Sequence, residues 1–318
     1  MKQKRRLLRM TPKQRAVAAL ELRQPDMVPT FELEFQLEEE MFGKAFLRQE
    51  DLRGLSASQK EYRLKANAEY MVHVFSQLEY SIIPVHYLEL EDALQTVRYL
   101  RELIDDEYML CAHGDGTYSI PSGHDMVEYS CWFFEHPDEA HAKARQMVED
   151  ALERNRKYVD AGLDCFIFCA DYCFNDGPFF SPKMFAEFVQ PYLADLVART
   201  KELGAYVIKH TDGNIMPILD QLVACEPHAL HSLDPMAGVD IAEVKRLVGD
   251  KVCLCGNVNC ALMQTGTDEE VIASAEYALK HGKPGGGYIF CTSNVPFKGL
   301  PPERYQLILD IWKKHREY

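Results

Sequence analysis

Short apolar runs alternate with longer charged or amphipathic stretches along most of this chain. Eight runs have the length and composition of buried strands: 28–34, 80–86, 108–112, 164–171, 205–210, 229–233, 251–256 and 287–291. Helix-favouring stretches separate most of them, for example 58–77, 137–161, 181–203, 240–248 and 268–281. This alternation predicts an α/β fold with parallel strands. Eight strands with intervening helices are typical of a closed (β/α)8 TIM barrel.

The ends of the predicted elements refine this picture. Thr11 and Pro12 predict the N-cap and first residue of the first helix, and Pro25 ends it. A doubly wound open sheet is the structural alternative, but no Gly-x-Gly-x-x-Gly turn follows the first predicted strand. Gly285–Gly287 precedes a strand rather than a helix, which favours a tight turn over a phosphate cradle. We therefore expect neither NAD nor ATP as a cofactor.

No linker or break in composition divides the 318 residues, so we expect 1–318 to form a single domain. The basic residues among 1–10 are expected to form a disordered arm. The formal net charge of -14 disfavours nucleic acid and anionic membranes as partners. The sequence has no run of about 20 apolar residues and no apolar signal-peptide core, so we expect a cytoplasmic protein. Its 10 cysteines should then be buried, free or metal-bound.

Polar side chains gather where the predicted strands end. In parallel barrels, catalytic residues lie at these carboxyl ends of the strands. A single polar residue there is commonly a loop cap, but six of the eight predicted strands end in this way, which predicts a shared cavity. The residues concerned are Glu32, Glu34, His86, Asp171, Tyr172, Asn175, His210, Asp212, Asn257, Cys291 and Asn294.

His210 and Asp212 are the most suggestive pair, because two residues that are two apart at a strand end can both reach the barrel mouth. With a cysteine from a neighbouring strand they have the donor types of a zinc site with an open position. The alternative is that His210 binds a backbone carbonyl and Asp212 caps the next helix. Glu32 and Glu34 share one strand face and could supply acid–base chemistry, or they begin a solvated loop.

Several motifs resemble, in the same order, those of the uroporphyrinogen decarboxylase superfamily. They are Met10–Arg15 with Pro25–Pro29, Ala170–Tyr172 followed by Gly177–Pro178 and Ser181–Phe185, His210–Gly213, Gly256–Asn259 and Gly286–Ile289. The resemblance implies a (β/α)8 barrel with its active site at the carboxyl ends of the strands. It also implies one of two chemistries: decarboxylation of uroporphyrinogen III without a cofactor, or methyl transfer to or from a corrinoid on a partner protein.

Three departures separate this chain from the decarboxylase pattern that the resemblance implies. Residues 31–38 contain no arginine where paired arginines are expected, and carboxylates there would repel a polyanionic substrate. His86 stands at the position of an aspartate, and Asn294 at about the position of a C-terminal histidine. The chain is therefore more similar to the corrinoid-dependent methyltransferases of the methylcobamide:coenzyme M type.

In those methyltransferases a His-x-Cys pair and a distant cysteine hold zinc. Here the resemblance places His210 and Asp212 at the pair, and the distant position falls at Asn294, with Cys291 three residues earlier. It thus implies His210, Asp212 and Cys291 as metal ligands. Oxygen donors would suit an ether or another oxygen substrate at least as well as a soft thiol.

We therefore predict an enzyme, a corrinoid-dependent methyltransferase that moves a methyl group between a small substrate and the cobalt of a partner corrinoid protein, with assistance from zinc. The expected catalytic residues are Asp171, Tyr172, His210, Asp212 and His86. The expected substrate-binding residues are Glu32, Glu34, Asn175, Asn257 and Asn294. The alternatives are a decarboxylase-like lyase acting on a porphyrin or a smaller carboxylate, and a barrel that only binds a corrinoid or tetrapyrrole. A homodimer is left open.

Overall fold

A parallel sheet is the centre of the fold in the computed structural model, which describes residues 9–318. Residues 1–8 of the predicted basic arm lie outside the described residues. Within 9–318 the sheet has seven strands, in the order β1-β2-β3-β6-β7-β8-β9. Their bounds are β1 Ile82–Pro84, β2 Met109–His113, β3 Cys165–Phe168, β6 Tyr206–His210, β7 Ala229–His231, β8 Cys253–Val258 and β9 Tyr288–Thr292. A separate antiparallel hairpin pairs β4 (Cys173–Phe174) with β5 (Gly177–Pro178).

The seven strands confirm seven of the eight predicted runs, whereas the first predicted strand, 28–34, makes only one parallel bridge in this sheet, between Thr30 and Phe290. Pro29 has no N–H to donate to a ladder. The N–H of Thr292 donates to the Glu32 carboxylate, so a side chain takes the place of a main-chain acceptor. The Ser81 N–H donates to the Thr30 carbonyl, so this segment lies between β9 and β1 without being a regular strand.

Helices follow most of the strands, as the alternation predicted. Thr11 caps the first helix with the expected side-chain hydrogen bond to Gln14. The predicted helix 181–203 is divided at Val189, because Pro191 lacks the N–H that a continuous helix would use. The helices are α1 Pro12–Leu20, α2 Glu38–Phe42, α3 Ala57–Gln77, α4 Leu90–Ile104, α5 Met126–Glu135, α6 Pro137–Asp160, α7 Pro182–Phe188, α8 Gln190–Glu202, α9 Leu219–Ala224, α10 Ile241–Val248, α11 Cys260–Thr265, α12 Asp268–Gly282 and α13 Pro302–His315.

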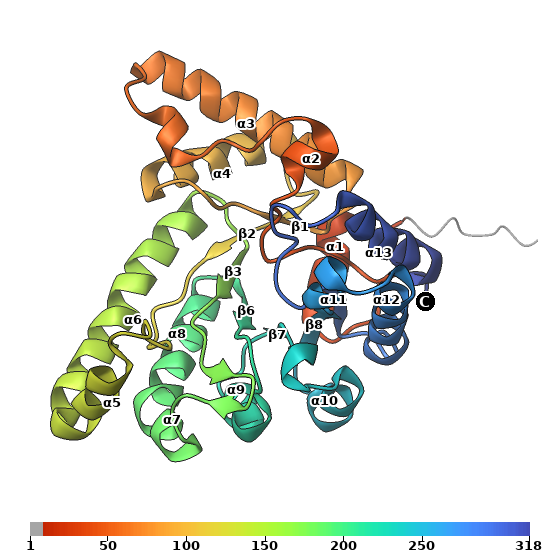
Figure 1. Ribbon diagram of the computed structural model, residues 1–318. Coiled ribbons are helices and arrows are strands. Elements are labelled where there is room, and N and C mark those ends of the chain that lie inside the picture. Colours follow the sequence, from red (N-terminus) through yellow and green to blue (C-terminus); the bar gives the residue numbers. More distant parts are fainter. Residues whose placement is uncertain (1–8) are drawn as a thin grey trace, which may run out of the picture.

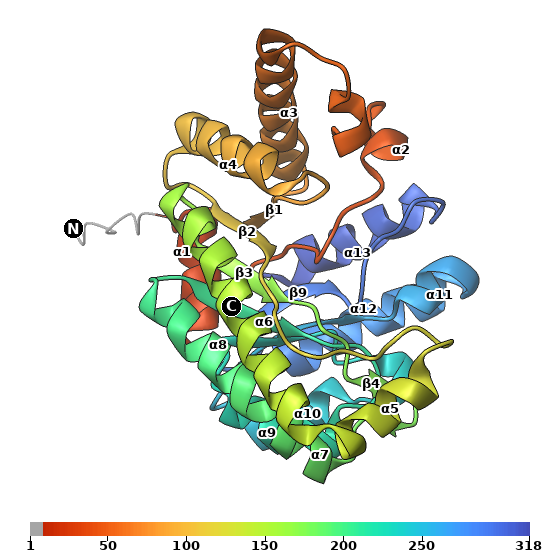
Figure 2. The ribbon, with the colours of Figure 1, turned by 90° about the vertical axis from the view of Figure 1, so that its left-hand side faces the viewer.

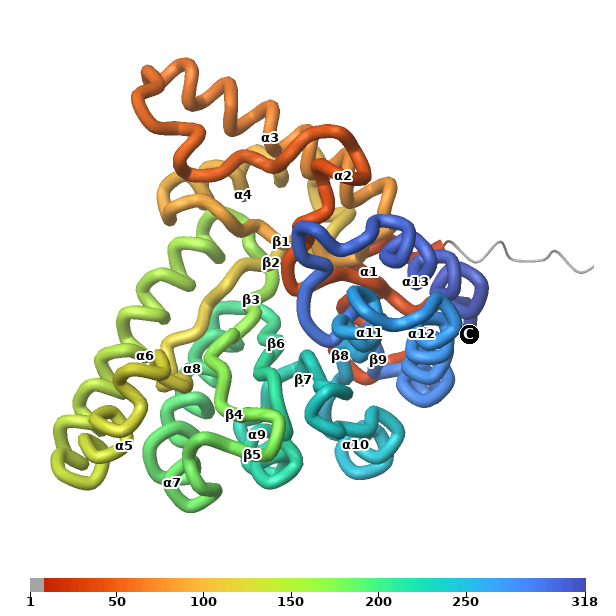
Figure 3. Tube along the Cα trace, in the orientation of Figure 1, coloured from red at the N-terminus to blue at the C-terminus, as the bar shows by residue number. Residues whose placement is uncertain are grey.

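Figure 1 shows the strands surrounded by helices, with α6 and α8 on one side and α12 and α13 on the other. The group α2, α3 and α4 lies together at the top of the molecule in both Figure 1 and Figure 2. In the view of Figure 3 the hairpin β4–β5 lies below β3 and β6, and the Asn214 N–H donates to the Phe174 carbonyl, which joins the hairpin to the loop after β6. Among residues 9–318, no helix combines the length and the apolar character that crossing a bilayer requires.

Candidate active site

Three side chains meet at the ends of β3 and β6. The His210 Nε2 atom lies 3.7 Å from Asp171 Oδ1 and 3.8 Å from Asp212 Oδ1. The imidazole is 5% exposed, whereas the carboxylate side chains are 45% exposed at Asp171 and 31% at Asp212. The sequence-predicted pair His210 and Asp212 is therefore brought together, and a buried nitrogen faces two solvent-accessible carboxylates.

Asp212 is held by hydrogen bonds from two other strand ends. Ser232 Oγ donates to Asp212 Oδ1 at 2.7 Å, and Asn294 Nδ2 donates to Asp212 Oδ2 at 2.6 Å. Burial raises the pKa of Asp212 to about 7 against the effect of the Ser232 hydrogen bond, and the negative charges of Asp171 and Asp234 add to this shift. These contacts replace the alternative that Asp212 caps the following helix.

His210 is fixed from its other side by a second histidine. The register of β6 and β7 places His210 beside His231, and their Nδ1 atoms are 2.8 Å apart. Burial, together with the neighbouring His231 and Lys209, lowers the pKa of His210, so the imidazole is neutral near pH 7. Its partner is thus a side chain, not the backbone carbonyl considered as an alternative.

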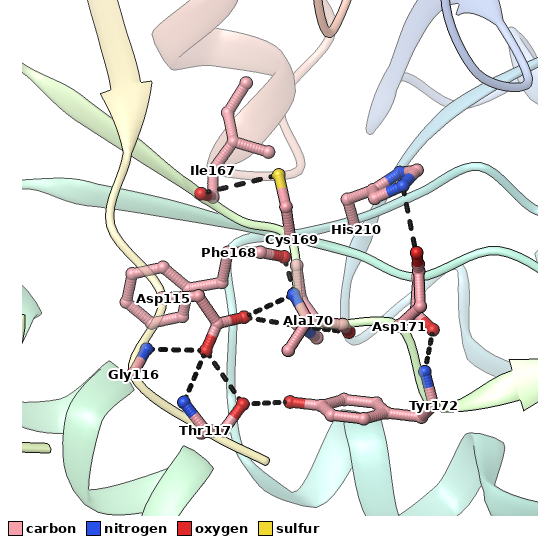
Figure 4. A network of polar contacts seen from close by, with 12 residues as sticks. Asp115, Gly116, Thr117, Ile167, Phe168, Cys169, Ala170, Asp171, Tyr172 and His210 are labelled. Carbon is pink, nitrogen blue, oxygen red and sulfur yellow. Dashed lines mark hydrogen bonds and ion pairs between the residues drawn. The ribbon is translucent and has the colours of Figure 1, made fainter. Parts of the chain in front are cut away.

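A buried ion pair supports the loop that carries Asp171. Lys209 Nζ lies 2.9 Å from Asp115 Oδ2 and also donates to the carbonyls of Phe168 and Ala170. The same Asp115 carboxylate accepts the N–H of Ala170. Burial alone would raise the pKa of Asp115, but the Lys209 ammonium and the hydrogen bonds lower it. Figure 4 shows this network beneath Asp171 and His210.

Tyr172 points into this network rather than toward the carboxylate cluster. Its hydroxyl is hydrogen-bonded to Thr117 at 2.6 Å, and its side chain is 2% exposed (Figure 4). Lys209 Nζ lies over the ring, 4.2 Å from its centroid. The hydroxyl therefore already has a partner, and a catalytic role for Tyr172 stays a prediction.

A second polar group combines Glu34 with two histidines. The His86 and His113 rings are stacked with centroids 4.1 Å apart, and Glu34 Oε1 lies 3.9 Å from His113 Nε2. His86 Nε2 is 2.9 Å from the Leu33 carbonyl. Burial, with a contribution from His113, lowers the pKa of His86. Glu34 and His86 are thus near one another, while the partly exposed His113, with 42% of its side chain accessible, was not anticipated.

Glu32 and Cys291 lie in the interior instead of at the cluster. Glu32 is 1% exposed and accepts hydrogen bonds from Thr292. Burial raises its pKa to about 8, although the hydrogen bonds from Thr292 and Tyr305 oppose the shift. The Cys291 thiol is 0% exposed, close to Glu32 and Cys260, and burial raises its pKa. Glu32 and Glu34 therefore do not share one environment.

Asn175 and Asn257, two of the predicted substrate-binding residues, lie in different surroundings. Asn175 is exposed in the turn between β4 and β5. Asn257 is 6% exposed on β8 and donates to the Leu233 carbonyl. Asn294, by contrast, contacts the cluster through Asp212.

The donor atoms at the cluster suit a divalent metal ion. Among residues 9–318, Asp171, His210 and Asp212 form a group whose potential ligand atoms all lie within 4.8 Å of one another. Cys291 is not in this group, so Asp171 takes the place that was predicted for the thiol. One imidazole nitrogen and two carboxylate oxygens, with His231 behind the imidazole, match the ligands and supporting contacts of open zinc sites.

Sequence reasoning missed the residues that support the cluster. His231 and Ser232 lie in the predicted strand 229–233, and Asp115 follows β2 closely. Lys209 could have indicated a buried ion pair, because it is a charged residue inside an apolar strand and a buried lysine needs a partner.

Comparison with known proteins identifies relatives. The methylcobamide:CoM methyltransferase MtaA of Methanosarcina barkeri is 24% identical over 217 residues, which cover 66% of this chain and 62% of that protein. A uroporphyrinogen decarboxylase of Aromatoleum aromaticum is 22% identical over 251 residues, covering 74% of this chain and 66% of that protein. The matched segments thus span less than two thirds of the length of either relative.

A solved structure, a methyltransferase from Methanosarcina mazei, superposes with a TM-score of 0.72 at 16% identity and covers 96% of this chain and 99% of that one. This likeness establishes the fold. The uroporphyrinogen decarboxylase (URO-D) family matches residues 72–315, which is most of the chain. The order of motifs, the fold and this match agree, and the chain belongs to the uroporphyrinogen decarboxylase family.

Proposed function

We propose that this chain is a corrinoid-dependent methyltransferase that moves a methyl group between a small oxygen-containing substrate and the cobalt of a partner corrinoid protein. The cluster of Asp171, His210 and Asp212 is the observation that carries the proposal. The similarity to MtaA supports the reaction class. The proposal treats the chain as one domain in which the segment 28–34 completes an eight-membered barrel.

The three side chains would hold a zinc ion, which when bound would act as a Lewis acid toward a substrate oxygen. His210 presents its Nε2 atom and is kept in place by His231. Asp212 is oriented by Ser232 and Asn294, so its carboxylate does not need to reorganise on binding. The oxygen-rich donor set favours an alcohol or ether over a thiol as the substrate.

The decarboxylase alternative has less support at this site. Glu34 and Asp171 are carboxylates on separate segments near the strand ends, and residues 31–38 contain no arginine to bind substrate carboxylates. A polyanionic porphyrinogen would be repelled by such a surface.

Methyl transfer can be tested directly with cobalamins. The purified protein, loaded with Zn²⁺, is incubated with methylcob(III)alamin and alcohol or thiol acceptors, and separately with cob(I)alamin and methoxylated donors. We expect a change in the cobalt absorption spectrum that the Asp212→Asn variant lacks. Asp160→Asn, at the exposed C-terminal end of α6, serves as the matched control. Release of CO2 from a porphyrinogen, with no cobalt change in any mixture, would contradict the proposal.

The affinity for Zn²⁺ should depend on pH through Asp212. Its carboxylate has a pKa of about 7 and must lose its proton to become a ligand. We therefore expect the apparent affinity to fall about tenfold for each pH unit below 7 and to level off above it. Calorimetric titrations in buffers of different ionisation enthalpy measure the proton released. In Asp212→Asn the remaining Zn²⁺ affinity should no longer change with pH in this way. An unchanged pH profile in that variant would exclude Asp212 as the origin of the pH dependence.

A further inference from the structure

His210 and His231 form a buried pair that makes contact through equivalent atoms. Their Nδ1 atoms are 2.8 Å apart, and the residues are 4% and 1% exposed. A hydrogen bond needs one donor and one acceptor, so one of the two Nδ1 atoms carries a proton and the other offers a lone pair. The tautomers of two neutral rings are therefore complementary.

The tautomer of the histidine pair decides which group His210 Nε2 presents to Asp171 and Asp212. If His210 carries its proton at Nδ1, its Nε2 atom offers a lone pair toward Asp171 and Asp212, and His231 must be protonated at Nε2. If His231 carries the shared proton, His210 is protonated at Nε2 and points an N–H at the two carboxylates. The first arrangement suits a metal ion and the second suits the metal-free cluster.

The outer side of His231 does not select between the two arrangements. Among the described residues, His231 Nε2 is buried and has no hydrogen-bond partner. The ring packs edge-on against Phe31, with centroids 5.9 Å apart. An apolar contact of this kind holds the ring in place and offers no conventional hydrogen-bonding group to the nitrogen. The tautomer of the pair is thus decided at the Asp171–Asp212 end.

The residue after His231 reinforces this role of β7. Ser232 adopts a left-handed backbone conformation, with φ of 85°, and its hydroxyl donates to Asp212. One dipeptide therefore contacts two of the three proposed ligands, His210 through His231 and Asp212 through Ser232.

We propose that His231 is a positioning residue that shares one proton with His210, so that His210 can present an N–H to the metal-free carboxylate cluster and a lone pair to a metal ion bound there. The part of this inference that concerns metal rests on the proposed function. On metal binding, His210 would release the Nε2 proton to solvent, the shared proton would move from His231 Nδ1 to His210 Nδ1, and His231 would take up a proton from solvent at Nε2. The pair gains and loses no net proton.

Two substitutions separate the hydrogen bond from the packing. His231→Asn places an amide atom near the position of Nδ1 and keeps the contact with His210, whereas His231→Phe keeps an aromatic ring and removes the contact. His228→Asn, just before the same strand, is the control. We expect Zn²⁺ affinity to fall about 10–100-fold in His231→Phe, the usual loss when a contact behind a ligand histidine is removed, and to change only a few-fold in His231→Asn and His228→Asn.

The nuclear magnetic resonance (NMR) spectrum of ¹⁵N-histidine-labelled protein gives a readout that does not depend on activity. In the metal-free wild type we expect His210 protonated at Nε2 and His231 at Nδ1, and Zn²⁺ should reverse both assignments. Wild-type affinity in a folded His231→Phe variant, or a His231 tautomer that ignores Zn²⁺ binding at His210, overturns the inference. Failure of the wild type to bind Zn²⁺ overturns the proposed metal site alone, because complementary tautomers in the metal-free spectrum would still support the shared proton.

Discussion

Replacing Asp115 by alanine should lower the free energy of unfolding by about 3–5 kcal/mol, the usual cost of leaving one member of a buried ion pair alone. The Lys209 side chain is 0% exposed, so its ammonium cannot reach water once the carboxylate is removed. The N–H of Ala170 would lose its acceptor at the same time. Because Ala170 precedes Asp171, the variant should also weaken metal binding at the cluster.

Urea denaturation of the metal-free protein measures this effect without interference from ligand binding. The matched control is Asp106→Ala, which removes an aspartate that contacts Lys13 but is 75% exposed; such surface pairs contribute about 0–1 kcal/mol. The double variant Asp115→Ala with Lys209→Met should recover part of the loss, because it leaves no isolated charge. A loss below about 1 kcal/mol in Asp115→Ala would mean that Lys209 is solvated or neutral.

The second large effect concerns pH and Glu32. Its folded-state pKa of about 8 lies above the ordinary value of 4.5, so the folded protein binds a proton that the unfolded chain has already lost. The contribution of Glu32 to stability is thus fully present below about pH 4.5 and is lost as pH rises to about 8. A shift of this size corresponds to about 5 kcal/mol at most.

The variant Glu32→Gln cannot ionise and resembles the protonated side chain in shape. We expect its free energy of unfolding to rise relative to that of the wild type between about pH 4.5 and pH 8. Above that range the difference between the two proteins should stay constant. Denaturation at a series of pH values, with Glu40→Gln as an exposed control, measures the difference. A constant difference across this range would show that Glu32 titrates normally.

The strands were predictable because each needs a local apolar run between turn residues, and parallel strands buried on both faces leave that trace in sequence. Seven of the eight predicted runs became strands. The exception, 28–34, has the same apolar pattern, but Pro29 and the side-chain hydrogen bond of Glu32 replace regular pairing. That replacement depends on Thr292, a residue 260 positions away, and no local pattern reports it.

The candidate site was predictable in part. His210 and Asp212 are two residues apart, and their convergence follows from strand geometry. Asp171 was correctly expected to lie near them, but the third metal-binding position was assigned to Cys291, which lies within β9 and is fully buried. The side on which a strand-end side chain emerges depends on the register between strands, and sequence alone does not give this.

The supporting residues were harder to foresee, because each is defined by a contact across the sheet. The supporting role of His231 depends on its contact with His210, and that of Asp115 on its ion pair with Lys209. The two predicted strand ends that were passed over, those of 108–112 and 229–233, are the ones that supply these residues.

The position of the segment 28–34 has a consequence for folding during synthesis. On one side its partners lie far along the chain: the Phe290 N–H donates to the Pro29 carbonyl, Trp312 donates to the Val28 carbonyl, and the Val28 N–H donates to the Arg316 carbonyl. The ribosome makes this segment long before these partners exist. Pairings so distant in sequence form slowly, so the nascent chain must carry an incomplete apolar edge until α13 has emerged.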